Sequence, residues 1–170
     1  MGRTNFLVEG VSGTGRTAVY RELQRRGVHA VNGDRELAYQ GDPMTGVSTQ
    51  TGGHEHHIWD LAKVRALIAD HSQPATYLCG GSRNSGQFID ELDAVFVLDV
   101  DAETLVRRLD QRPAGERGHH PAERALVLRL HRTREDTPRN GIVVDARPAL
   151  VEVVNTILSL SRTIGSNETK

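Results

Sequence analysis

Residues 10–17 read GVSGTGRT and lie between an apolar run and a helical pattern. This stretch matches G-x-x-x-x-G-K-[ST] except at Arg16, which stands where the pattern has lysine. Glycines let such a loop turn its backbone N–H groups inward, and these groups bind anions together with the following helix N-terminus. The predicted phosphate loop consists of Gly10, Val11, Ser12, Gly13, Thr14, Gly15, Arg16 and Thr17. Thr17 would place its hydroxyl on Mg²⁺, and the alternative is a glycine-rich turn that binds nothing.

Arg16 keeps the positive charge of the usual lysine but changes its shape. A guanidinium group is planar and bulkier, with a fixed fork of donors. It can hold phosphate oxygens, but it cannot follow a migrating phosphoryl group as a compact ammonium does. The hypothesis is therefore that nucleotide binding survives and that turnover is lowered.

Apolar runs alternate with helical patterns along the chain. Strands are predicted at residues 6–8, 28–31, 75–79, 94–98 and 141–144, and helices at 17–26, 58–69, 102–111, 121–135 and 148–160. Such alternation predicts an α/β fold with a parallel sheet and helices on both faces. We expect one domain over residues 1–161 and a flexible tail over 162–170.

Two irregular segments interrupt this pattern. Residues 32–57 are rich in glycine and polar residues, and residues 112–120 form a basic loop. Long irregular segments in a compact α/β domain are usually functional, and ligands bind beyond the carboxyl ends of the strands. We expect the first segment to bind an acceptor and the second to be a lid.

Composition narrows the class of protein. The chain has 170 residues, of which 21 are basic and 22 acidic, so a nucleic-acid partner is not expected. Cys79 is the only cysteine, which excludes an intramolecular disulfide and a cysteine-rich zinc site. No apolar run is long enough to span a membrane, and no signal peptide fits before the first strand. A cytoplasmic monomer or homodimer is expected.

Further motifs follow the phosphate loop in a fixed order: Asp34, Gly80-Gly81, VFVLDVDAETLVRRLDQR at 95–112, the basic loop, and IVVDARP at 142–148. In this order the chain resembles the small P-loop kinases, the superfamily of nucleoside-monophosphate, shikimate and gluconate kinases. The resemblance implies a three-layer P-loop NTPase fold with a five-stranded parallel sheet of order 2-3-1-4-5. It also implies ATP and Mg²⁺ as cofactors.

The resemblance implies roles for residues on the nucleotide side. Arg108 matches an arginine that stacks on adenine, and Arg112 matches one that clamps the phosphates at the edge of the lid. Arg117 lies inside the lid and could close on the transferring group. The loop that frames the adenine edge is matched by Asp145, Ala146, Arg147 and Pro148. For each helical arginine the alternative is a solvated helix face.

On the acceptor side the resemblance assigns Asp34 to a Mg²⁺-bound water or to orienting the acceptor hydroxyl. Asp34 could also accept the hydroxyl proton, and the alternative is a helix N-cap. Gly80-Gly81 matches a glycine turn against the acceptor, after which Arg83 could grip an anionic group. No acid follows the third strand, where a Walker B carboxylate would stand.

Histidines gather just before the helix predicted at 58–69. His54 and His57 are predicted to contact the acceptor, with helix capping and solvated histidines as the alternative. Together with His56 they lack the i, i+4 spacing of a helical zinc pair, so a dedicated metal site is not favoured. The sole tryptophan, Trp59, is expected to pack in the core.

The sequence thus predicts an ATP-dependent phosphotransferase. It would move the γ-phosphate of Mg-ATP to a small hydroxylated metabolite or a nucleoside (mono)phosphate. The alternative is a nucleotide-binding sensor or partner with little or no turnover, which Arg16 and the missing third-strand acid favour. A GTPase switch is disfavoured because no N-K-x-D motif is present.

Overall fold

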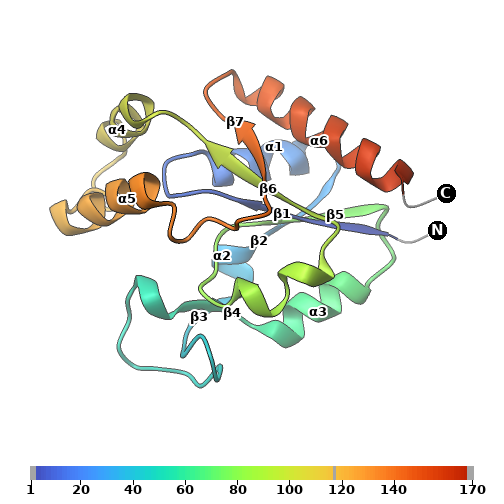
Figure 1. Ribbon diagram of the computed structural model, residues 1–170, viewed down its shortest axis with the longest axis horizontal. Coiled ribbons are helices and arrows are strands. Elements are labelled where there is room, and N and C mark those ends of the chain that lie inside the picture. The colour runs from blue at the N-terminus through green and yellow to red at the C-terminus, as the bar shows by residue number, and fades with distance from the viewer. Residues whose placement is uncertain (1–2, 117, 168–170) are drawn as a thin grey trace.

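A computed structural model describes residues 3–116 and 118–167 of the chain (Figure 1). Its centre is a five-stranded sheet in the order β2-β5-β1-β6-β7, with every neighbouring pair parallel. The strands are β1 (Thr4–Glu9), β2 (His29–Asn32), β5 (Ala75–Cys79), β6 (Ala94–Asp99) and β7 (Ile142–Asp145). Counted along the chain within this sheet, the order is second, third, first, fourth, fifth. The labels differ from the predicted 2-3-1-4-5 because two further strands, β3 and β4, lie between β2 and β5.

Helices cover both faces of the sheet (Figure 1). Two of them, α1 (Arg16–Arg25) and α6 (Leu150–Asn167), pack on one face, and α3 (Leu61–Ala69) packs on the other. Because successive side chains of a strand point to opposite faces, Phe6 and Val8 join the core under α1 and α6, whereas Leu7 joins the core under α3. This is the three-layer arrangement that the alternating pattern predicted.

The edge that carries the carboxyl ends of the strands holds the connections with chemical side chains. There β1 runs into the phosphate loop, and α4 (Ala102–Asp110) and α5 (Pro121–Thr133) follow β6. Figure 1 shows α4 and α5 together at the left of the sheet, beyond this edge, while both termini lie at the opposite end. The predicted lid, residues 112–120, connects these two helices.

The segment between β2 and α3 is more ordered than the sequence predicted. It contains α2 (Gly33–Glu36), η1 (His54–His56) and an antiparallel pair of β3 (Ala38–Gln40) with β4 (His57–Trp59). The helix predicted from residue 58 therefore begins later, at Leu61. Asp60 caps it by accepting hydrogen bonds from the N–H groups of Ala62 and Lys63 at 3.0 and 3.2 Å. The period of the apolar residues did not reveal this cap.

Residues 162–167 of the predicted tail belong to α6, which continues through them. Hydroxyl groups bond back to carbonyls one turn earlier, as in Ser166 to Arg162 at 2.8 Å, and Ile164 packs against the core. Residues 168–170 lie outside the described part of the chain. Within residues 3–116 and 118–167, no helix combines the length and apolarity needed to cross a membrane.

Candidate active site at the phosphate loop

The phosphate loop connects β1 to α1 in a tight backbone path. Gly13 has φ of 98°, and a Cβ there would lie 2.7 Å from the Leu105 side chain, so the site requires glycine. The Thr14 hydroxyl donates to the Val11 carbonyl at 2.8 Å, which closes the loop on itself. The N-cap residue of α1 is Gly15, which has no side chain to cap the helix, and no acidic residue occupies the first turn. The N–H groups at this helix end are therefore available for a phosphate.

Arg108 holds the phosphate loop against the loop after β7. From α4 it donates to the carbonyls of Thr14 and Ala146 at 3.1 and 2.7 Å. It is thus not part of a solvated helix face, which was the alternative. Asp145 and Arg147 form an exposed ion pair at 2.9 Å beside it, ahead of Pro148. Contact of these residues with adenine stays a prediction.

Arg112 reaches the phosphate loop from the base of the lid. Its Nη1 donates to the Ser12 hydroxyl at 2.9 Å, so the structure brings together the two predicted phosphate contacts. Burial lowers the pKa of Arg112, but arginine stays charged at neutral pH. The predicted lid residue Arg117 lies outside the described residues.

Thr17 is exposed in the first turn of α1, next to the anion site. Mg²⁺ in phosphate-transfer sites is held by few protein ligands, together with substrate phosphates and waters. A single hydroxyl here fits that pattern. No group of three histidine, cysteine or acidic side chains within residues 3–116 and 118–167 is placed to hold a metal ion on its own.

Arg16 crosses the site toward the acceptor side. Its Nη2 lies 3.5 Å from Asp34 Oδ2, in an ion pair that is partly exposed. Asp34 also accepts hydrogen bonds from His57 Nε2 at 3.1 Å and from the N–H of Gly81 at 3.2 Å. The structure therefore brings together predicted residues from four separate segments.

Asp34 is an ionised carboxylate at neutral pH. Burial alone would raise its pKa, but the hydrogen bond with His57, the charge of Arg16 and the Gly81 N–H outweigh burial and lower the pKa. The alternative role as a helix N-cap is wrong, because α2 begins at Gly33 and its N-cap position is Asn32. The Asp34 side chain instead contacts Arg16, His57 and Gly81.

The diglycine turn after β5 makes room for these groups. A Cβ at Gly80 would lie 2.7 Å from Asp34 Oδ1, and one at Gly81 would lie 2.7 Å from Arg16 Nη1. Trp59 lies beneath the turn, fully buried and stacked on Phe88 with ring centroids 5.7 Å apart. Its predicted place in the core is confirmed.

Asp136, after α5, is a residue that the sequence did not reveal. It accepts from Arg83 Nη1 and pairs with His54 Nε2, each at 2.5 Å. Burial would raise the pKa of Asp136, but His54 and Arg83 lower it. The predicted acceptor residues Arg83 and His54 therefore contact the segment that follows α5. Nothing in the local pattern around Asp136 distinguishes it from a surface acid.

Glu9 is the second residue that sequence reasoning missed. It ends β1 directly before Gly10 and is only 7% exposed, and its Oε2 has no hydrogen-bond partner among the residues that the structure describes. Burial raises its pKa to about 8, against the lowering effect of Arg16. A charged residue directly after the apolar residues 6–8 was the available signal.

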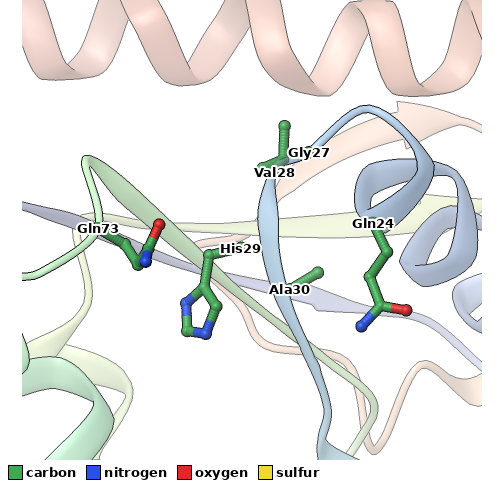
Figure 2. A pocket seen from close by; sticks show the side chains of 6 residues that line it. All are labelled: Gln24, Gly27, Val28, His29, Ala30 and Gln73. Atoms are coloured by element: carbon green, nitrogen blue, oxygen red, sulfur yellow. The ribbon is translucent and has the colours of Figure 1, made fainter.

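Two hollows lie outside the phosphate loop. One, of about 540 Å³, is lined by Arg83 and Asp136 together with other residues from segments 82–95 and 135–140. The other, of about 280 Å³, lies at the amino end of β2 and is lined by Gln24, His29 and Gln73 among others (Figure 2). His29 is bonded there to Thr76, and the hollow is at the sheet edge opposite the phosphate loop. Neither is lined by residues of the phosphate loop.

A sequence profile of the AAA domain family matches residues 7–129 of this chain. Because this match covers more than half of the chain, the chain belongs to that family. A comparison with curated proteins found no relative. The profile match includes the phosphate loop, Asp34, the diglycine turn and the predicted lid.

Three solved kinase structures share the fold that the resemblance implied. A gluconokinase from Sinorhizobium meliloti 1021 is 19% identical, with a TM-score of 0.65 over 98% of this chain and 95% of its own. A sugar kinase from Janibacter sp. HTCC2649 is 21% identical, with a TM-score of 0.58 over 92% and 93%. A shikimate kinase from Aquifex aeolicus vf5 is 18% identical, with a TM-score of 0.57 over 96% and 98%.

Proposed function

We propose that the protein is an ATP-dependent small-molecule kinase. It transfers the γ-phosphoryl group of Mg-ATP to a hydroxyl group of a small metabolite or nucleoside (mono)phosphate. The observation that carries the proposal is the position of Arg16, which leaves the phosphate loop and ends 3.5 Å from Asp34. A triphosphate on the loop and an acceptor at Asp34 would therefore face each other.

On the nucleotide side, the N–H groups of residues 10–17 would hold the phosphates, and Arg16 and Arg112 would balance their charge. Thr17 would contribute its hydroxyl to Mg²⁺. Phosphoryl transfer requires positioning and charge stabilisation, with little covalent work for the protein. Arginines that converge on the loop from α1 and from the base of the lid fit this requirement.

On the acceptor side, Asp34 would accept the proton of the attacking hydroxyl. The oxygen then bonds to the γ-phosphorus as the bond to the bridging oxygen of ADP breaks. Asp34 is ionised and held in place by His57 and Gly81, so it is oriented before the acceptor arrives. His54, Arg83 and Asp136 would shape the far side of the acceptor site.

A nucleotide-binding protein with little turnover is the second candidate. Arg16 in place of the usual loop lysine and the absence of an acid directly after β5 favour it. A planar guanidinium also follows a migrating phosphoryl group less well than an ammonium.

Measuring ADP separates the two candidates. The protein would be incubated with ATP, Mg²⁺ and a panel of hydroxylated metabolites and nucleoside monophosphates. Acceptor-dependent ADP supports the kinase, and tight ATP binding without ADP supports the second candidate. Asp34→Asn should abolish the ADP signal, whereas Asp110→Asn, which alters an exposed acid paired with Arg124, should leave it unchanged.

A further inference from the structure

The buried carboxyl of Glu9 has no structural explanation in the fold. It ends β1 and is 7% exposed, and no residue in the described part of the chain hydrogen-bonds to its Oε2. Leaving a buried polar atom unpaired costs free energy, and such atoms are rare in folded proteins. A buried glutamate whose Oε2 finds no partner among residues 3–116 and 118–167, in a site lined by charged groups, is therefore a candidate for binding a ligand.

The Glu9 carboxyl is aimed at the diglycine turn. A Cβ built on Gly81 would lie 3.4 Å from Glu9 Oε1 and 2.7 Å from Arg16 Nη1. A Cβ built on the neighbouring Gly80 would lie 2.7 Å from Asp34 Oδ1. Two carboxyl groups from different segments therefore flank the same turn, next to the cation of the phosphate loop.

These two carboxyl groups carry different charges at neutral pH. Burial raises the pKa of Glu9 to about 8; Asp136 and Asp34 add to this rise, and Arg16 and Arg83 oppose it. Glu9 is therefore protonated and can donate a hydrogen bond through its O–H, whereas the lowered pKa of Asp34 leaves it an acceptor. One donor and one acceptor side by side suit two adjacent hydroxyl groups.

Arg83 and Arg16, two described cations beside this turn, already have partners. Arg83 forms an ion pair with Asp136 at 2.5 Å, and His54 pairs with the same carboxylate. Arg16 lies beside Asp34 and belongs to the phosphate loop. An anionic group on the acceptor would have to break one of these pairs to be neutralised, whereas an uncharged group would not.

We propose that Glu9 and Asp34 form a subsite for adjacent hydroxyl groups of an uncharged polyhydroxy acceptor. Glu9 donates to one hydroxyl, and Asp34 accepts from the hydroxyl that is phosphorylated. This inference rests on the proposed kinase function and adds to it the chemical class of the acceptor and a binding residue.

The test is calorimetric binding of uncharged and charged probes. D-sorbitol, D-glucose, myo-inositol and uridine are the uncharged probes, and D-gluconate and D-glucosamine are the charged ones. Each is titrated into protein saturated with Mg²⁺ and a non-hydrolysable ATP analogue, and in parallel into protein without nucleotide. We expect at least one uncharged probe to bind, about tenfold more tightly than its charged counterpart. Tighter binding of D-gluconate or D-glucosamine, or no binding of any uncharged probe, overturns the inference.

Variants of Glu9 assign the binding to this residue. Glu9→Leu should weaken binding of the uncharged probe about tenfold, and Glu9→Gln, which keeps a donor, should weaken it by no more than about twofold. Affinity of the wild type should fall above about pH 8 as Glu9 ionises, whereas that of Glu9→Gln should stay flat. Glu91→Gln, which changes an exposed acid paired with Arg65, is the matched control.

The outcomes separate this inference from the proposed function. If the ATP analogue fails to bind, the kinase function fails, and the titration without nucleotide still decides the subsite. If acceptor-dependent ADP is formed but Glu9→Leu binds the acceptor as the wild type does, the kinase function stands and the role of Glu9 is refuted.

Discussion

Replacing Glu9 by glutamine should stabilise the protein, and the gain should grow with pH. In the folded chain Glu9 keeps its proton up to about pH 8, whereas its ordinary pKa is 4.5. Between these values the unfolded chain releases the proton and the folded chain retains it, so the free energy of unfolding falls as pH rises. Glutamine has nearly the same shape and no proton to release, so the variant escapes this loss.

The magnitude follows from the two pKa values. A pKa difference of one corresponds to about 1.4 kcal/mol. The gain should be near zero at about pH 4, about 3 kcal/mol at about pH 7, and close to its ceiling of about 5 kcal/mol above about pH 9. A stability cost of this kind is typical of a residue kept for function.

Urea unfolding at several pH values provides the assay. Trp59 is the only tryptophan and is fully buried, so its fluorescence reports unfolding. Glu91→Gln, at an exposed position, should show no comparable pH-dependent difference from the wild type. A difference between Glu9→Gln and wild type that stays constant with pH would refute the reasoning, because Glu9 would then ionise alike in both states.

Three further predictions concern activity and the acceptor site. Arg16→Lys should raise the phosphoryl-transfer rate while ATP affinity stays within about tenfold, because an ammonium follows the γ-phosphate better; an unchanged rate in single-turnover kinetics contradicts this. Asp34→Asn should lower kcat about a hundredfold or more with little change in ATP affinity, and a normal rate would remove Asp34 from the mechanism. Asp136→Asn should weaken its contacts with Arg83 and His54 and raise the acceptor KM more than it lowers kcat; an unchanged KM would limit Asp136 to a structural role.

Local patterns predicted most of the secondary structure, and they failed where a local signal was weak. The five parallel strands are short apolar runs, and β1, β5 and β6 are buried on both faces, so the sequence marks them directly. The pair of β3 and β4 was missed because each strand has three residues, and their pairing depends on a contact between residues 38–40 and 57–59. Ile58 fits the period of the following helix, although that helix begins only at Leu61, after its N-cap residue Asp60.

The sequence alone determined the phosphate loop, since the spacing of glycines, Arg16 and Thr17 is a property of one continuous segment. Tertiary structure decided what surrounds it. Glu9, Asp34 and Gly81 are far apart along the chain and meet only because the carboxyl ends of parallel strands share one edge of the sheet. The protonated state of Glu9 also depends on the tertiary structure, because packing removes water from its carboxyl group and raises its pKa. The local sequence does not show that this carboxyl group is buried.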